Sequence, residues 1–137
     1  MIVADTGAML ALIDRSDRHH GAVRAIHEEA PDAWLLPWAI LPEVDYLVSS
    51  YLGPSAEEAF LADLAAGVFN VEWGREADLT RAHALARQYS ALGLGLVDAI
   101  VIGTAERMLA EAIATLDYRH LGAVRIKGNP ALWPRDA

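Results

Sequence analysis

The sequence predicts one α/β domain over residues 1–137, a three-layer α/β/α sandwich in which helices cover a parallel β-sheet. The length suits a single compact domain. Hydrophobic residues make up 54% of the chain, which is enough for a substantial core. Short strand-like runs also alternate with longer helix-like runs, and this alternation implies right-handed βαβ crossovers and therefore a parallel sheet.

The first half of the chain predicts two strands and four helices. The expected ranges are strands 2–4 and 34–36, and helices 8–13, 18–30, 39–51 and 56–66. We expect Asp17 to cap the helix over 18–30. Ser55, with Glu58 three residues later, has the capping-box pattern expected before the last of these helices.

The second half predicts three more strands and two helices. The expected ranges are strands 68–73, 112–116 and 123–126, and helices 75–92 and 97–109. Apolar residues recur at close to helical spacing in the 75–92 segment. Gly93 and Gly95 then separate the two helices.

Composition limits the functions to consider. The chain has no cysteine, which excludes disulfides and thiolate metal sites and favours a reducing compartment. The longest apolar stretch, 94–105, is shorter than the roughly 20 residues of a membrane span and contains Asp98. We therefore expect a cytoplasmic protein. The net charge of −8 argues against nucleic-acid binding by the whole surface, but it permits a local basic rim and a basic protein partner.

Four acidic residues occupy matching places in the predicted units. Asp5 and Asp117 follow the carboxyl ends of strands, whereas Glu43 and Asp98 lie in the first turns of helices that begin on the same side of the sheet. In open parallel sheets, sites form beyond the carboxyl ends of the strands, where the strand order reverses. If the first strand neighbours the fourth, all four carboxylates face one crevice.

Converging carboxylates raise each other's pKa unless a positive charge lies among them. Mg²⁺ and Mn²⁺ prefer oxygen ligands and retain several waters. A cation held in this way polarises a phosphate and lowers the pKa of a bound water. The arrangement therefore best fits hydrolysis of a phosphodiester bond.

Each carboxylate also has a purely structural interpretation. Asp5 could cap a helix, and Asp98 could be a first-turn carboxylate favoured by the helix dipole. Glu43 could be a solvated helix residue, and Asp117 could lie in a turn. Asp98, however, interrupts the apolar run 96–102, where a charge needs partners. The functional interpretation depends on the four placements together.

The motifs resemble those of PIN-domain ribonucleases, and among these the VapC-like toxins of bacterial type II toxin–antitoxin pairs. Matching segments run through nearly the whole chain: Ile2-Val3-Ala4-Asp5-Thr6, Leu41-Pro42-Glu43-Val44, Leu96-Val97-Asp98-Ala99-Ile100-Val101-Ile102, and Ala114-Thr115-Leu116-Asp117-Tyr118-Arg119-His120-Leu121. The resemblance implies a parallel sheet of order 3-2-1-4-5, Mg²⁺ or Mn²⁺ as cofactor, and endonucleolytic cleavage of RNA.

The resemblance also implies roles for individual residues. Asp5, Glu43, Asp98 and Asp117 match the family's acidic positions. We expect Asp5, Asp98 and Asp117 to hold the metal ion, and Glu43 to complete the site or orient the attacking water. Thr6 and Thr115 match polar positions beside them, whereas Gly7 stands where Ser or Asn is commoner, which removes a polar group close to the ligands.

A VapC-like identity further implies a cognate antitoxin and a homodimer. RNA binding requires neutralisation of phosphate charge. We predict that Arg15, Arg18 and Arg119 contribute to a positive rim, together with Arg125 and Lys127. Each of these could equally be a solvated surface residue.

Three other interpretations remain at this point. A receiver-like signalling module should carry an Asp at the end of the third strand, but that segment reads Val71-Glu72-Trp73. A catalytically inactive PIN-like binding protein would retain the fold without the activity. A dinucleotide-binding domain lacks its G-x-G-x-x-G turn here. The histidines form no zinc motif, and His120 lies near Asp117 without a clear catalytic role.

Overall fold

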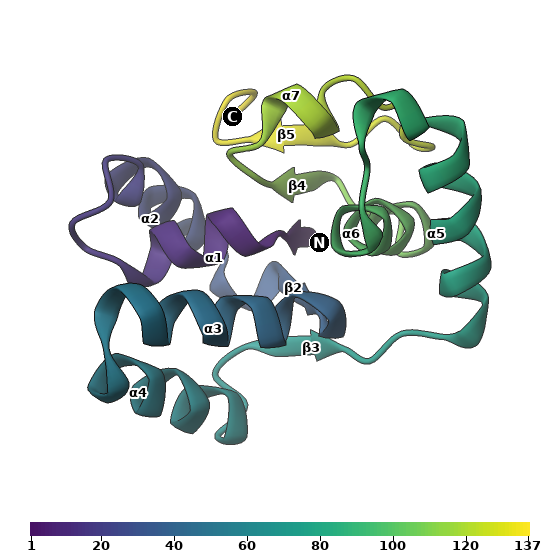
Figure 1. The fold of residues 1–137 in the computed structure, drawn as a ribbon. Helices are drawn as coiled ribbons and strands as arrows, with labels where there is room; N and C mark the ends of the chain where they lie inside the picture. The colour runs from purple at the N-terminus through teal and green to yellow at the C-terminus, as the bar shows by residue number, and fades with distance from the viewer.

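The computed structural model describes every residue from 1 to 137 (Figure 1). The strands are β1 (Ile2–Ala4), β2 (Trp34–Pro37), β3 (Asn70–Glu72), β4 (Ala112–Ala114) and β5 (Ala131–Trp133). The α-helices are α1 (Thr6–Ile13), α2 (His20–Glu29), α3 (Leu41–Leu52), α4 (Pro54–Ala65), α5 (Glu76–Gln88), α6 (Leu96–Arg107) and α7 (Tyr118–Leu121). Short 3₁₀ segments are η1 (Pro31–Ala33), η2 (Trp38–Ile40) and η3 (Ser90–Leu92). None of the helices is both long and apolar enough to cross a bilayer.

The five strands form one parallel sheet of order β3-β2-β1-β4-β5, which confirms the order implied by the family resemblance. Val3 of β1 pairs with Leu35 of β2 on one side and with Ile113 of β4 on the other. The strand order therefore reverses beside β1. The carboxyl ends of β1 and β4 lie next to each other at this reversal.

The central strands β1 and β4 are apolar throughout and do not alternate polar with apolar residues, because both of their faces lie in the core. Every residue of β1 and β4 is buried, as expected for parallel strands covered on both faces. Helix α6 packs against β1 and β2, and α5 packs against α6. At the left of Figure 1, α1 packs against both α2 and α3, and α4 packs against α3. Helices therefore flank the sheet, as predicted.

The fifth strand lies at Ala131–Trp133, so the prediction of a strand over 123–126 was wrong. Val124 and Ile126 are buried within a loop, which explains their apolar alternation without strand pairing. The actual strand is short and follows Pro130. A proline is tolerated there because β5 is an edge strand that pairs only with β4.

Two predicted helix caps were also wrong. Helix α2 begins at His20, and the Asp17 carboxylate instead accepts a hydrogen bond from the His19 backbone N–H at 2.7 Å. Helix α4 begins at Pro54 after Gly53, without a side-chain cap, so Ser55 lies inside its first turn. Proline suits a first helical position because its φ angle is already helical and it has no N–H to satisfy.

The outer edge of β5 is closed by the residues that follow it. The Asp136 carboxylate accepts a hydrogen bond from the Leu132 N–H at 2.8 Å. The Asp136 N–H in turn donates to the Leu132 carbonyl at 2.8 Å. The middle residue of the edge strand therefore has both of its outward-facing backbone groups paired.

Candidate active site

Asp5 lies where β1 passes into α1. Its backbone N–H donates to the Ala114 carbonyl of β4 at 3.0 Å, and its carboxylate caps α1 by accepting the Ala8 N–H at 2.9 Å. The Thr115 hydroxyl donates a hydrogen bond to the other carboxylate oxygen. Burial raises the pKa of Asp5 from 3.8 to about 6, against the lowering effect of these two hydrogen bonds. The charges of Asp98 and Asp117 raise it further.

Asp117 lies beyond the carboxyl end of β4, where it caps α7. Its backbone N–H donates to the Thr115 hydroxyl oxygen at 2.9 Å. Thr115 is fully buried and contacts both aspartates, donating to the Asp5 carboxylate and accepting from the Asp117 backbone. This threonine therefore links the two neighbouring strand ends.

Asp98 and Glu43 lie in the first turns of α6 and α3. Partial positive charge at a helix N-terminus favours a carboxylate in that position. Burial nevertheless raises the pKa of Asp98, and the charges of Asp117 and Glu43 raise it further. Only the coulombic effect of His120 lowers it. Glu43 is exposed.

All four predicted carboxylates line one cavity of about 550 Å³ at the carboxyl edge of the sheet. The cavity wall consists of Asp5, Thr6, Gly7, Glu43, Leu47, Asp98, Leu116 and Asp117. No basic side chain is among them. The acidic neighbours in this wall contribute to the raised pKa values of Asp5 and Asp98, and the positive charge that would relieve their repulsion must come from outside the wall.

The donor set fits a hard divalent cation in kind, because such ions prefer carboxylate and hydroxyl oxygens. Thr6 lines the cavity, and its hydroxyl oxygen is buried and has no hydrogen-bond partner within the protein. No group of three or more His, Cys, Asp or Glu side chains is arranged so that it could hold a metal ion as it stands. Direct protein ligands would therefore be few, and waters would complete the coordination.

The residues predicted to form a basic rim do not belong to this wall. Arg15 and Arg18 are exposed in the loop between α1 and α2, and Arg119 is exposed on α7, two residues after Asp117. None of them lines the cavity. The structure brings the acidic residues together without placing a basic rim on the cavity wall.

His120 is a site residue to which the sequence assigned no role. Its Nδ1 lies 2.9 Å from one Asp117 carboxylate oxygen and 3.0 Å from the other. Its backbone N–H also donates to that carboxylate at 3.1 Å. The three-residue spacing between Asp117 and His120 could have indicated this contact, because a helix-capping side chain accepts a backbone N–H two or three residues later. His120 thus fixes the orientation of the Asp117 side chain.

Comparisons with known proteins agree with this geometry. The PIN domain family model matches residues 2–126. Ribonuclease VapC26 of Mycobacterium tuberculosis is 32% identical over 128 residues, which cover 93% of this chain and 95% of that protein.

Solved structures share the fold at low sequence identity. Mycobacterium tuberculosis VapC20, described as a Sarcin-Ricin loop cleaving toxin, matches with a TM-score of 0.80 and 20% identity over 90% of this chain and 95% of its own. A DNA-bound VapBC from Salmonella typhimurium matches with a TM-score of 0.70 and 18% identity, over 96% of this chain and 95% of its own. FitAcB from Neisseria gonorrhoeae matches with a TM-score of 0.62 and 17% identity, and the match covers 96% of both chains. With the family model matching nearly the whole length and a relative more than 30% identical, this chain belongs to the PIN domain family.

Proposed function

We propose that this protein is a metal-dependent endoribonuclease and the toxin of a toxin–antitoxin pair, with Mg²⁺ or Mn²⁺ as its cofactor. The observation that carries the proposal is the single cavity into which four separate elements place Asp5, Glu43, Asp98 and Asp117. The similarity to Ribonuclease VapC26 supports the reaction class and the biological role.

Asp5, Asp98 and Asp117 are the residues proposed to hold the ion, directly or through water. Mg²⁺ usually takes one or two carboxylates and keeps several waters, which agrees with a wall where no three side chains converge on one point. Thr6, whose buried hydroxyl has no partner within the protein, lines the same cavity. When bound, the cation supplies charge neutralisation and polarises the scissile phosphate.

The chain's own groups hold and orient the reactants. Thr115 and the Ala8 N–H fix the Asp5 carboxylate, and His120 fixes that of Asp117. Glu43 is exposed at the cavity, where its carboxylate can orient the attacking water. Hydrolysis joins the water oxygen to phosphorus and breaks the bond to the 3′ oxygen, which takes up a proton. The products are a 5′-phosphate and a 3′-hydroxyl.

The remaining partners follow from the same family. RNA approaching the acidic cavity needs cations, and Arg15, Arg18 and Arg119 are the exposed residues proposed to supply them. A basic antitoxin would complement the net charge of −8. A homodimer is proposed from the family resemblance.

Cleavage of RNA by the purified chain tests the nuclease proposal. A mixture of structured and single-stranded RNAs is incubated with Mg²⁺ or Mn²⁺, and the new ends are mapped. Asp98→Asn is expected to lower cleavage at least a hundredfold, because it removes a charge at the cavity while keeping the shape of the side chain. The matched control Asp32→Asn changes an exposed aspartate outside the cavity and should cleave like the wild type.

Chelation should stop cleavage, and either cation should restore it. Undiminished cleavage by Asp98→Asn, or cleavage that persists in chelator, would contradict the proposal. The toxin role has its own test, in which growth is followed on induction with and without the neighbouring open reading frame. Unchanged growth with an active nuclease would separate the enzymatic proposal from the toxin proposal.

A further inference from the structure

Two tryptophans mark a second hollow at the carboxyl edge of the sheet. Trp38 directly follows β2 and Trp73 directly follows β3, and 36% and 74% of their surfaces are exposed. They line a hollow of about 250 Å³, which we call the tryptophan notch. Its other lining residues are Gly74, Arg75, Glu76, Asp78, Leu79 and Ile100. Exposed tryptophan is unusual on a protein surface and marks a place where a flat partner can be bound.

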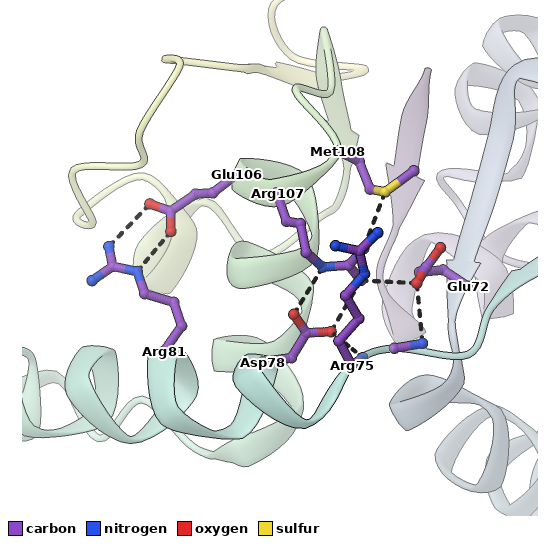
Figure 2. A network of polar contacts seen from close by, with 8 residues as sticks. Glu72, Arg75, Asp78, Arg81, Glu106, Arg107 and Met108 are labelled. Carbon is purple, nitrogen blue, oxygen red and sulfur yellow. Dashed lines mark hydrogen bonds and ion pairs between the residues drawn. The ribbon is translucent and has the colours of Figure 1, made fainter.

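The loop that carries Trp73 is held in place by a network of ion pairs (Figure 2). The Glu72 carboxylate accepts the Gly74 N–H at 3.1 Å and the Arg107 guanidinium at 2.8 Å. The Asp78 carboxylate accepts the Arg75 N–H at 3.0 Å and the same guanidinium at 2.8 Å. The backbone on both sides of the turn is therefore tied to one largely buried arginine, so Trp73 and Arg75 are presented by a preorganised loop.

Gly74 brings this loop into direct contact with Trp38. Its φ of +83° is a conformation that side-chain-bearing residues rarely adopt. A Cβ at this position would lie 2.7 Å from Nε1 of the Trp38 indole. The close approach fixes the two walls of the tryptophan notch relative to each other.

The tryptophan notch lies close to the carboxylate cavity. Strand β3 is two places from β1 in the sheet, which is about 10 Å at the usual strand spacing of about 4.8 Å. Helix α6 lies between the two, since Asp98 lines the cavity and Ile100, on another face of the helix, lines the notch. At that separation, a nucleic-acid strand whose phosphate reaches the carboxylates can extend to the notch within a few nucleotides.

We propose that the tryptophan notch binds an unpaired base of the RNA substrate, stacked on Trp73, with Arg75 beside a neighbouring phosphate. The inference rests on the proposed ribonuclease function. Single-stranded RNA is bound largely by stacking of splayed bases on aromatic side chains, with basic groups on the backbone. Arg75 is exposed and forms no salt bridge in the structure, although its charge also lowers the pKa of Asp78, so its guanidinium is the cationic group of the notch that a phosphate can approach.

The size of the hollow favours one base over a larger ligand. Its 250 Å³ lies below the roughly 300–1,000 Å³ of pockets that enclose drug-sized molecules. A second copy of this chain is the other partner that exposed tryptophans could serve. RNA-binding and sedimentation measurements on Trp73→Leu distinguish an RNA base from a second copy of the chain.

Binding is measured on the full chain by fluorescence anisotropy of labelled single-stranded RNA decamers, in chelator so that nothing is cleaved. Trp73→Leu is expected to raise the Kd at least fivefold, as for loss of one stacked base. Trp73→Phe should retain most of the affinity, because a ring is still present. The matched control Tyr51→Leu removes another aromatic that is 71% exposed, at the far end of α3, and should leave the Kd unchanged.

Several outcomes would overturn the inference: no RNA binding by the wild type, equal affinity of Trp73→Leu and wild type, or an equal loss in the Tyr51→Leu control. Sedimentation supplies a fourth, because a wild-type dimer that Trp73→Leu converts to a monomer would make the notch a contact between copies. A wild type that binds RNA through Trp73 but cleaves none with Mg²⁺ or Mn²⁺ would support the notch and refute the nuclease. Cleavage of RNA by a protein whose RNA binding does not depend on Trp73 would support the nuclease and refute the notch.

Discussion

Replacing Asp5 by Asn should stabilise the metal-free protein while abolishing the proposed activity. Asp5 is only 5% exposed, and its pKa is raised from 3.8 to about 6. A raised pKa means that the folded state binds the proton more tightly than the unfolded state does. The stability associated with the neutral carboxyl is fully present below pH 3.8, declines between pH 3.8 and about 6, and is lost above that range.

The size of the effect follows from the same two values. A tenfold change in an equilibrium constant is about 1.4 kcal/mol, so the ionised Asp5 costs about 3 kcal/mol of unfolding free energy at pH 7 or above. Asparagine has no charge to desolvate, and its carbonyl can still accept the Ala8 N–H. Allowing for an imperfect hydrogen bond to Thr115, we expect a gain of about 2 to 3 kcal/mol, or about 7 to 10 °C in Tm for a chain of this length.

The assay is thermal unfolding of both proteins in chelator between pH 4 and pH 8. The difference between them should be near zero at pH 4 and reach its full size above pH 7. Asp32→Asn, at an exposed position, should show no such pH-dependent gain. A loss of stability in Asp5→Asn at pH 7.5, or a gain of the same size at every pH, would refute the assignment of a desolvated charge to Asp5.

Three further predictions concern the cation and the ion-pair network. Mn²⁺ should raise the Tm of the wild type more at pH 7.5 than at pH 5, since protonation of the raised-pKa carboxyls competes with the cation, and Asp98→Asn should reduce the increase. Arg107→Met should lower the free energy of unfolding in urea by about 3 kcal/mol, because it leaves the Asp78 carboxylate buried without its partner. Gly74→Ala should cost about 1 to 3 kcal/mol, from its positive φ and the contact with Trp38, and should weaken RNA binding through displacement of the loop.

Matched controls distinguish these effects from general damage. Arg24→Met breaks an exposed helical pair with Glu28 and should cost less than about 1 kcal/mol. Gly21→Ala adds a methyl group in α2 where no atom lies within 4 Å, and should stabilise by about 0.5 to 1 kcal/mol. Equal losses from Arg107→Met and Arg24→Met would contradict the network's structural role. A Tm increase with Mn²⁺ that is independent of pH would contradict competition between protons and the cation.

The positions of the acidic residues were predictable because they follow from the order of short apolar runs and helix starts along the chain. Each short buried strand ends in a polar residue or leads into a helix start, so Asp5 and Asp117 could be assigned to strand ends from the apolar runs alone. Their adjacency required the strand order, which came from the family resemblance and which the sheet confirms. Their catalytic roles stay a prediction.

Apart from the two helix caps, which are local, the failures involve contacts between residues far apart in sequence. Strand β5 is defined by hydrogen bonds to β4, whereas residues 123–126 are apolar because two of them are buried in a loop. The link that Thr115 makes between two strand ends depends on a hydroxyl orientation that no spacing reveals. Arg107 likewise meets Glu72 across 35 positions.

Closure of the β5 edge by Asp136 has a consequence for association. Exposed strand edges invite main-chain pairing with other molecules and thereby promote aggregation. The pKa of Asp136 is lowered, chiefly by its hydrogen bond with Arg135, so its carboxylate keeps accepting the Leu132 N–H in mildly acidic solution. Extending the sheet on the β5 side would therefore first require the residues after β5 to be displaced.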